Sequence, residues 1–368
     1  MSVLARPALG KLAGLLTRAI SDFGGAFMAP LITIGDRLGL YRTLAVAGPL
    51  TATELATLTG TFGPYIHEWL NAHAASGYLN YSSQSDRYEL TDEQAMLFAD
   101  PDSPAFVVGG FQAAMAAGRI VDRLTNAFCS GEGISWHEHD HGVPTGWGSL
   151  QRVGYLNHLL QDWIPALDGV QSKLEAGIDV ADVGCGAGHA TLIMAKAFPK
   201  STFVGIDSSI ESIASAIEIT RHTHITNVSF QVAQAHNCSG SNYEFVTTFN
   251  ALHYMGDPVA ASRHVFQTLA PNATWMIVEP YAGDQVEENL NPIGRVHYAS
   301  STLFSIPHSL NENGRMGLGA QAGEARIREV VMSGGFGHCR RVSQTPWHLC
   351  LEAGNRDRNP GLRGTPST

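Results

Sequence analysis

Residues 181–189, ADVGCGAGH, restrict the possible fold of this chain more than any other stretch. A short apolar run leads directly into three glycines at every second position, Gly184, Gly186 and Gly188. Glycine has no side chain and tolerates positive φ, so such a loop lets the backbone come close to a ligand. A strand that ends in a glycine loop before the helical stretch ATLIMAKAF is typical of ligand-binding α/β folds.

The chain alternates between strand-like and helix-like stretches from about Val170 onward. Candidate strands are DVADVG, TFVGID, VSFQVA, FVTTFNAL and TWMIVEP, with helical stretches such as SIESIASAIEIT and DPVAASRHVFQTLA between them. The later segment CRRVSQTPWHLCLEA adds two short strands around a turn. This pattern predicts a Rossmann-like α/β fold with a doubly wound, mostly parallel, seven-stranded sheet.

The first hundred residues predict a different fold. Three helical stretches followed by the hairpin-like YLNY and RYEL give the order of a winged helix, and Thr51 and Glu54 have capping-box spacing. We therefore predict a winged-helix domain used for dimerisation or substrate covering over 1–100. A helical connector and lid would follow over 101–168, a ligand-binding domain over 169–353, and a disordered tail over 354–368.

Charge and cysteine content exclude several classes of partner and compartment. The net charge is −10, and the third helical stretch, GPYIHEWLNAHAASG, carries no Lys or Arg, so we predict no nucleic-acid partner. No apolar run is long enough to cross a membrane. Five cysteines without a CxxC pair predict free thiols and a cytoplasmic protein. The basic N-terminus weakly resembles a transit peptide, but we favour an amphipathic helix that packs on a partner subunit in a homodimer.

The glycine spacing decides which ligand the loop suits. A dinucleotide fingerprint would need a third glycine at position 189, where the chain has His189, and a triphosphate loop would need GK[ST]. Instead, Asp182 precedes the loop and Asp207 ends the next strand, where an acid binds ribose hydroxyls. A ligand with a ribose, no phosphate and a charged amino-acid end fits these features, which indicates S-adenosylmethionine.

The segment VADVGCGAGHATLIMAKAFPKSTFVGIDSS resembles motifs I and II of class I S-adenosylmethionine-dependent methyltransferases. Segments such as LHYMGDP and VEPYAGD extend the resemblance to a bacterial, actinobacterial-type subfamily with an N-terminal winged-helix domain, over about 26–353. The resemblance implies that Asp182 and the glycines hold the methionyl and ribose side, and that Asp207 binds the ribose. The remaining cofactor residues that we predict are Ser208, Gln234, Ala235 and Asn250.

Methyl transfer is an in-line displacement, so the protein must align the acceptor, exclude water and, for a protonated acceptor, supply a base. His253, at the end of the fourth strand, is our candidate general base, because imidazole titrates near neutrality. Glu279 ends the fifth strand and could accept a proton or hold a substrate amine. The alternative for both residues is structural: packing, or capping of the next segment.

Polar and aromatic residues in two further segments are our substrate candidates. In SWHEHDHG, His137, His139 and His141 alternate, so an extended chain would turn all three to one side, as a metal site needs. Because base-assisted methyl transfer needs no metal, we predict substrate contacts and no metal. The segment RVHYASS would suit a carboxylate or phenol. The predicted substrate residues are Trp136, His137, His139, Tyr155, Tyr254, Arg295, His297 and Tyr298.

The sequence thus predicts an S-adenosylmethionine-dependent methyltransferase that acts on a small molecule, most readily on oxygen. Two alternatives remain open. One is a cofactor-sensing transcription regulator built on the winged helix. The other is a methyltransferase fold that runs a non-methylating reaction. Members of the resembled subfamily have Asp at the positions of Asn250 and Tyr254, which weakens any transfer of substrate identity and keeps the second alternative open.

Overall fold

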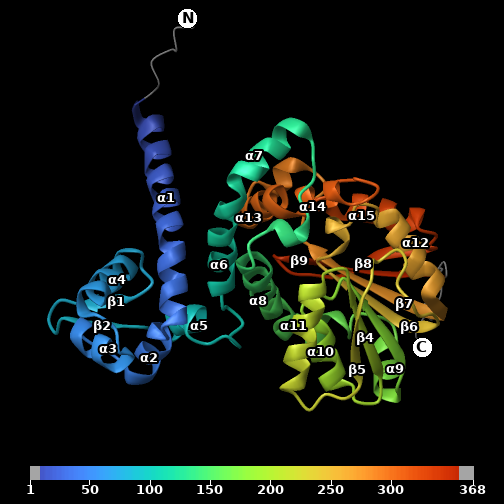
Figure 1. The fold of residues 1–368 in the computed structure, drawn as a ribbon, viewed down its shortest axis with the longest axis horizontal. Coiled ribbons are helices and arrows are strands. Elements are labelled where there is room, and N and C mark those ends of the chain that lie inside the picture. The colour runs from blue at the N-terminus through green and yellow to red at the C-terminus, as the bar shows by residue number, and fades with distance from the viewer. Residues whose placement is uncertain (1–8, 356–368) are drawn as a thin grey trace, which may run out of the picture. The chain divides into compact units, whose positions relative to one another are not determined.

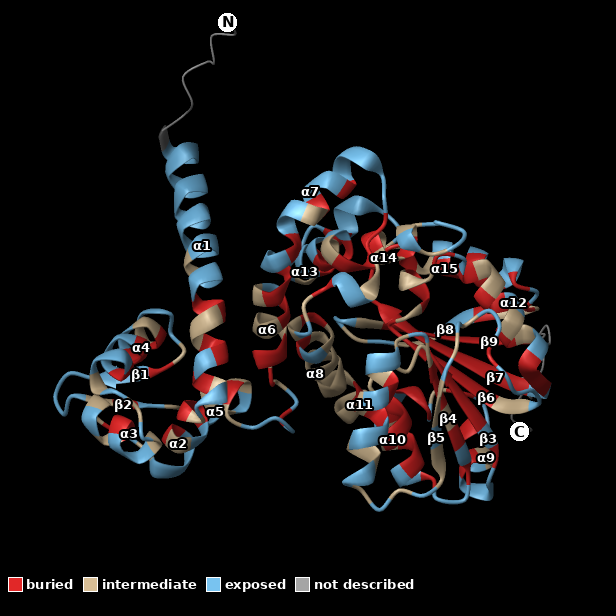
Figure 2. Cartoon of the chain, viewed as in Figure 1, coloured by how far each residue is buried: buried red, intermediate tan, exposed pale blue. Residues whose placement is uncertain are grey.

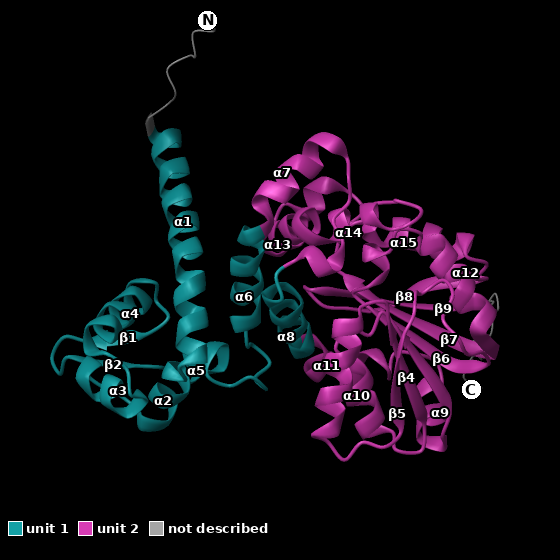
Figure 3. Ribbon diagram, in the orientation of Figure 1, with its two compact units in different colours: residues 1–119, 140–153 teal, residues 120–139, 154–368 magenta. Residues whose placement is uncertain are grey.

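The computed structural model describes residues 9–355 and divides into two compact units (Figure 3). Unit 1 comprises residues 1–119 and 140–153, and unit 2 comprises residues 120–139 and 154–368. The connector predicted over 101–168 is therefore divided between the units. The first eight residues and most of the predicted tail, 356–368, lie outside the described residues.

Unit 1 contains the predicted winged helix. Three helices and a hairpin occur in the expected order, and the side chain of Thr51 accepts from the Glu54 N–H at 3.2 Å while Glu54 Oε2 accepts from the Thr51 N–H at 2.8 Å. The prediction of a capping box is thereby confirmed. The elements are α1 (Leu9–Arg37), α2 (Leu40–Ala47), α3 (Ala52–Thr59), α4 (Gly63–Ala75), β1 (Asn80–Ser82), β2 (Arg87–Glu89), α5 (Asp92–Phe98) and α6 (Val108–Ala117).

An imidazole lies at the centre of the winged-helix core. His73 is fully buried between Tyr41 and Trp69. Its Nδ1 lies 2.7 Å from the Trp69 carbonyl, which can only accept, so Nδ1 donates and Nε2 accepts from the Tyr41 hydroxyl at 2.7 Å. Both ring nitrogens are therefore satisfied inside the core.

The sheet of unit 2 has the predicted seven strands, in the order β5-β4-β3-β6-β7-β9-β8. Strands β3 to β7, the first five of this sheet along the chain, pair in parallel, and β9 is antiparallel to both of its neighbours. The predicted doubly wound, mostly parallel fold is confirmed (Figure 1). The strands are β3 (Asp179–Val183), β4 (Thr202–Asp207), β5 (Val228–Val232), β6 (Tyr243–Phe249), β7 (Leu269–Pro280), β8 (His338–Gln344) and β9 (His348–Gly354).

Successive residues of the central strands enter two different hydrophobic cores, because side chains alternate across a sheet. On β3, Val180 joins one core and Ala181 the other, and on β6 the same division separates Phe245 from Val246. Both faces of the sheet are thus covered, and the central strands are buried (Figure 2). The covering helices include α9 (Val170–Ala176), α10 (His189–Ala197), α11 (Ile210–Arg221), α12 (Pro258–Thr268) and α15 (Gly323–Ser333).

The remaining segments of unit 2 are short helices, several of them near the carboxyl ends of the strands. They are η1 (Gly118–Ile120), which begins in unit 1, α7 (Val121–Ser130), η2 (Trp136–Glu138), η3 (Leu159–Trp163), η4 (Leu252–Tyr254), η5 (Val286–Asn289), α13 (Pro292–Ser300), η6 (Ser301–Ser305) and α14 (Ile306–Asn311).

Helix α8 (Gly142–His158) begins with GVPTGWG, a stretch whose glycines and proline disfavour a helix. The reason that it is helical is a tertiary contact within unit 1. A Cβ on Gly146 would lie 2.5 Å from the Gly109 carbonyl oxygen, and one on Gly109 would lie 2.4 Å from the Gly146 oxygen. The two glycines let α6 and α8 approach closely, and this contact outweighs the low helix propensity of GVPTGWG.

Candidate functional site

The glycine loop follows β3 and leads into α10. All three glycines have positive φ, at 77°, 55° and 75° for Gly184, Gly186 and Gly188. A Cβ on Gly184 would lie 2.5 Å from the Ala251 Cβ, and one on Gly188 would lie 2.6 Å from the Phe230 ring. A Cβ on Gly186 would meet no atom within 4 Å. Packing therefore requires the two outer glycines, while the middle one has open space beside its backbone.

Asp207, at the end of β4, braces the tip of this loop. Its Oδ2 accepts from the Gly186 N–H at 2.8 Å, and its Oδ1 accepts from the Ser209 N–H at 2.9 Å. Burial raises the pKa of Asp207, although these two hydrogen bonds oppose the shift. A carboxylate has about four acceptor positions, so two remain for a ligand hydroxyl.

Asp182 lies beneath the loop instead. Its carboxylate accepts from Thr191 of α10 at 2.5 Å and from Thr247 of β6 at 2.9 Å. It is 1% exposed, and burial raises its pKa to about 6. Asp182 therefore ties the strand under the loop to two neighbouring elements, and its role toward a cofactor stays a prediction.

The other predicted cofactor residues follow the carboxyl ends of β4, β5 and β6. Ser208 and Gln234 are exposed, and Ala235 is half-buried. Asn250 is buried at φ 50°, and its Nδ2 donates to the Tyr155 hydroxyl at 3.3 Å. A positive φ in a residue other than glycine is strained, and such strain is common at ligand sites.

His253 and Glu279 form a buried pair at the ends of β6 and β7. Nδ1 of His253 is hydrogen-bonded to Oε2 of Glu279, and Oε1 accepts from the N–H groups of Ala251 at 3.1 Å and Leu252 at 2.9 Å. Because an ionised carboxylate only accepts, Nδ1 carries the proton and Nε2 keeps its lone pair. Nε2 has no hydrogen-bond partner among the described residues. The sequence named both residues separately, and the structure joins them.

The loop that contains Trp136 adds aromatic surface next to this pair. The Trp136 ring lies 5.4 Å from the ring of Tyr254, edge to face, and 5.7 Å from the ring of His139. Tyr254 in turn lies 4.4 Å from the His253 ring, between ring centroids. Trp136, His139 and Tyr254 are thus brought together beside His253.

The three alternating histidines do not share one face. A 3₁₀ turn at Trp136–Glu138 leaves His137 exposed with its Nδ1 on Ser135, buries His139, and puts the exposed His141 in unit 1. The expectation of one common side assumed an extended chain and is wrong. Among residues 9–355, no three His, Cys, Asp or Glu side chains gather in a way that could hold a metal ion.

Helix α13 separates its three predicted substrate residues. His297 is buried, and its ring lies 5.4 Å from the ring of Trp347. Burial lowers the pKa of His297 to about 4, with a smaller contribution from His253. Arg295 is exposed and Tyr298 is half-buried.

Sequence reasoning missed several aromatic and ionisable residues of this region. Phe304 lies 5.6 Å from the His139 ring, and His308 lies 5.8 Å from the Trp136 ring. Nε2 of His308 pairs with Glu312 at 3.5 Å. No local sequence pattern marks these positions, because only the tertiary packing of η6, α14 and the turn before β9 brings residues of these segments next to the site.

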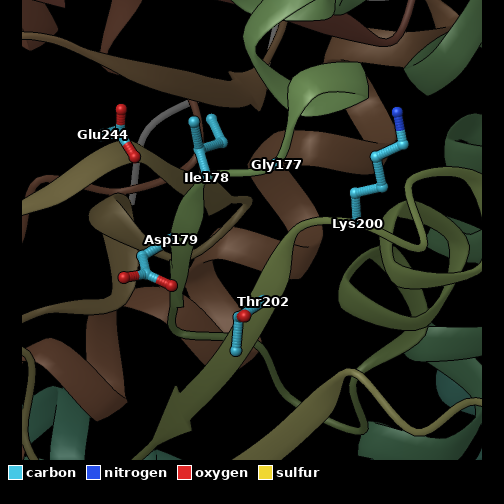
Figure 4. Close-up of a pocket in the computed structure, with 6 residues that line it drawn as sticks. All are labelled: Gly177, Ile178, Asp179, Lys200, Thr202 and Glu244. Atoms are coloured by element: carbon cyan, nitrogen blue, oxygen red, sulfur yellow. The ribbon is translucent and has the colours of Figure 1, made fainter.

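A separate hollow lies at the opposite edge of the sheet (Figure 4). Its lining residues sit at the amino ends of β3, β4 and β6, away from the glycine loop and His253. It is therefore no part of the candidate site. The lining residues are Gly177, Ile178, Asp179, Lys200, Thr202 and Glu244.

Two domain families match the chain. Residues 174–315 match the methyltransferase domain family, and residues 26–99 match the Rv2258c-like winged HTH domain family. A curated relative, trans-aconitate 2-methyltransferase of Deinococcus radiodurans, is 27% identical over 111 residues, which are 30% of this chain. The match spans 41% of the length of that relative.

Solved structures of similar fold cover nearly the whole chain. A putative O-methyltransferase from Nostoc punctiforme has a TM-score of 0.69 and 16% identity, and covers 95% of this chain and 99% of its own. The mitomycin 7-O-methyltransferase MmcR has a TM-score of 0.67 and 18% identity, and the match covers 94% of this chain and 100% of MmcR. Human N-acetylserotonin methyltransferase, solved with S-adenosylmethionine, has a TM-score of 0.67 and 15% identity. The match covers 96% of this chain and 99% of the human protein.

These matches show a methyltransferase domain over residues 174–315 joined to a winged-helix domain of the Rv2258c-like family over residues 26–99. The strand order and the similar solved structures show that the chain has the fold of these methyltransferases. The predicted fold and methyltransferase domain are confirmed, and the similar structure solved with S-adenosylmethionine supports the predicted cofactor. No helix within residues 9–355 is long and apolar enough to span a membrane.

Proposed function

We propose that this protein transfers a methyl group from S-adenosylmethionine to a hydroxyl oxygen of a small molecule, with His253 as the general base. The observation that carries the proposal is the buried His253–Glu279 pair, which leaves Nε2 of His253 free to accept a proton. The names of similar structures support oxygen as the acceptor atom, since several of them are O-methyltransferases.

The residues around the glycine loop fit the cofactor. The open space beside Gly186 admits a ligand next to the backbone, and Asp207 keeps two acceptor positions for ribose hydroxyls. The exposed amide of Gln234 can accept from the adenine amino group. When bound, the cofactor supplies a methyl group that its sulfonium has already activated.

The residues of the chain supply the proton chemistry. Nε2 of His253 takes the proton of the acceptor hydroxyl, and the Glu279 carboxylate stabilises the imidazolium that forms. Glu279 is held in turn by the N–H groups of Ala251 and Leu252, so the imidazole has a fixed orientation. The rings of Trp136 and Tyr254 beside it keep water away from the reacting groups.

A DNA-binding regulator is the weaker function. Helix α4 of the winged helix carries no Lys or Arg, and Arg87 of the hairpin is bound to Glu54 by two hydrogen bonds of 2.8 and 2.9 Å. The basic footprint that phosphate contacts need is therefore missing from this surface. We keep the predictions of a small-molecule partner, no nucleic-acid partner and a cytoplasmic location.

Homodimerisation through α1 is part of the proposal. Its outer face carries exposed apolar side chains at helical spacing, including Leu16, Phe23 and Phe27. An apolar stripe of this kind indicates a protein partner. A double substitution of Leu16 and Phe23 by Asp should convert a dimer to a monomer in light scattering. A wild-type monomer would refute this part of the proposal.

Calorimetric titration with S-adenosylhomocysteine tests the cofactor site. Asp207→Ala should weaken binding about 10- to 100-fold, because hydrogen bonds to a charged group are lost. Asp179→Ala, at the exposed opposite end of the sheet, is the matched control and should bind like the wild type. Failure of the wild-type chain to bind would end the proposed function.

Product mass separates methyl transfer from the alternative reactions of this fold. With cofactor and a hydroxylated aromatic acceptor, the product should gain one methyl group. A chain that binds cofactor yet converts its substrate without that gain would run a non-methylating reaction instead.

A further inference from the structure

Among the described residues, three histidines of unit 2 have two buried ring nitrogens without a hydrogen-bond partner: His139, His297 and His338. His338 lies at the amino end of β8, whereas His139 and His297, which are 7% and 5% exposed, lie at the other edge of the sheet. Native proteins satisfy the great majority of their buried polar groups, because an unpaired one costs the free energy of desolvation. Two such imidazoles in one region indicate polar groups that a ligand provides.

Both imidazoles lie at the edge of the sheet that holds the proposed base. The His139 ring packs against Trp136, and Trp136 contacts Tyr254 next to His253. The His297 ring packs against Trp347, and the following residue, His348, pairs with Pro280 at the end of β7. Each imidazole therefore stands beside an indole at the carboxyl ends of β6 and β7.

The electrostatics of the two side chains argue against a charged ligand. Burial lowers the pKa of each to about 4, so both rings are neutral at pH 7 and can donate and accept hydrogen bonds. The groups that influence the two pKa values are His308, Glu138 and His253, with no Lys or Arg among them. Arg295, the nearest arginine along the chain to His297, is exposed. A buried carboxylate would thus meet no cation among the described groups that act on these two imidazoles, which is costly.

We propose that His139 and His297 determine acceptor specificity by hydrogen-bonding polar groups of an uncharged, multiply oxygenated aromatic molecule. The inference rests on the proposed function, because the molecule is the methyl acceptor of the same site. The planar rings of Trp136 and Trp347 pack against the acceptor, and the imidazoles bind its oxygens other than the one that is methylated. Loss of these contacts affects the binding of the acceptor, and leaves the cofactor site intact.

The experiment measures binding of three two-ring probes to the full-length protein saturated with S-adenosylhomocysteine. The probes are a dihydroxynaphthalene (the diol), a naphthol and a hydroxynaphthoate (the carboxylate). Their binding is measured by calorimetry at pH 7. The diol should bind about tenfold more tightly than the naphthol, since one added hydrogen bond is worth about that factor. The carboxylate probe should bind more weakly than the diol. This order of affinities can be measured on the wild-type protein, without any variant.

The variants His139→Phe and His297→Phe keep an aromatic ring and remove both nitrogens. At least one should lower diol affinity about tenfold while naphthol and S-adenosylhomocysteine affinities change less than about twofold. The corresponding Gln variant should recover part of the loss. His338→Phe is the control: its ring nitrogens are also unpaired, but it pairs with Gly354 at the opposite edge of the sheet.

Several results would overturn the inference while leaving the cofactor site standing. These are tightest binding of the carboxylate, equal binding of diol and naphthol, or no binding of any probe to protein that binds S-adenosylhomocysteine. Phe variants that lose only stability would also overturn it, because buried water would then be the partner of the imidazoles. Loss of S-adenosylhomocysteine binding by the wild type would instead refute the proposed function.

Discussion

Buried histidines occur in both units, and their surroundings differ. His73 in the winged helix and His297 in the methyltransferase unit are both buried, and burial lowers the pKa of each to about 4. Both nitrogens of His73 are hydrogen-bonded, to Tyr41 and Trp69, whereas both nitrogens of His297 are unpaired. Burial and a lowered pKa therefore do not separate a structural imidazole from a functional one. We propose that an unpaired imidazole at the carboxyl edge of the sheet does.

His253 is the intermediate case, with one nitrogen paired and one left over. Glu279 fixes its Nδ1, while Nε2 remains available. A structural histidine gains nothing from such an arrangement, but a base needs it, because one nitrogen orients the ring and the other accepts the proton. The following predictions test whether the three kinds of histidine behave as their hydrogen bonds indicate.

The largest effect is expected at His253. His253→Gln keeps a hydrogen-bonding side chain but removes the basic nitrogen, so kcat should fall about 100- to 10,000-fold. Affinity for S-adenosylhomocysteine should barely change, which calorimetry can measure. A variant that keeps most of its turnover would make His253 a positioning residue and move the search for a base elsewhere.

The second effect is acid destabilisation from His73. Its pKa is about 4 in the folded protein against 6.5 for the free side chain, so the unfolded chain binds the proton more readily between these values. Stability should therefore fall as the pH drops below 6.5 and level off below 4, by about 3 kcal/mol from this group. Urea unfolding across this range measures the loss.

The pH comparison needs a reference, because other buried histidines titrate in the same window. His73→Leu removes only the contribution of this group, so the difference between the two pH profiles isolates it. Profiles that run parallel from pH 7 to pH 4 would contradict the prediction.

The third prediction uses the same variant at pH 7. His73→Leu leaves the Tyr41 hydroxyl without its acceptor and removes the side-chain hydrogen bond to the Trp69 carbonyl, which should cost about 2 kcal/mol of unfolding free energy. Because His73 lies in the core of the winged helix, kcat and acceptor affinity should stay near the wild-type values. A large fall in kcat in a stably folded variant would break the distinction between the two kinds of histidine.

The smallest effect is expected for Tyr41→Phe. This change removes one hydroxyl and leaves Nε2 of His73 without its donor, at a cost of about 1 kcal/mol. The ring of Tyr41 still stacks on Phe98, 5.1 Å between centroids, so packing is retained. In thermal unfolding, Tyr41→Phe should therefore be more stable than His73→Leu. The reverse ranking would contradict the hydrogen bond between Tyr41 and His73.

Features with a local signal could be predicted from the sequence. The capping box at Thr51 and Glu54 needs only residues three apart, and the glycine loop needs only the conformational freedom of its own residues. The strands β3 to β6 appeared as short apolar runs because each buries both faces in a doubly wound sheet. The carboxyl-edge position of His253 and Glu279 followed from that alternation alone.

Features that depend on contacts between distant residues could not be predicted. The sequence placed His253 and Glu279 at strand ends, but only the pairing of β6 with β7 brings the two side chains into contact. The expectation that His137, His139 and His141 face one side was also wrong, because this segment forms a 3₁₀ turn and is not extended. Likewise, α8 starts earlier than its composition suggests, since Gly109 and Gly146 allow close helix packing.

The sequence by itself thus determined the class of this protein, through the acid–glycine–acid spacing of Asp182, the loop and Asp207. Those residues act through backbone geometry that a short segment specifies. Only the tertiary structure decided which imidazoles are paired and which are not, because the bonds of His73 to Tyr41 and of His253 to Glu279 join residues 32 and 26 positions apart. His73, His253 and His297 are the same residue type, and the fold alone gives them three different sets of neighbours.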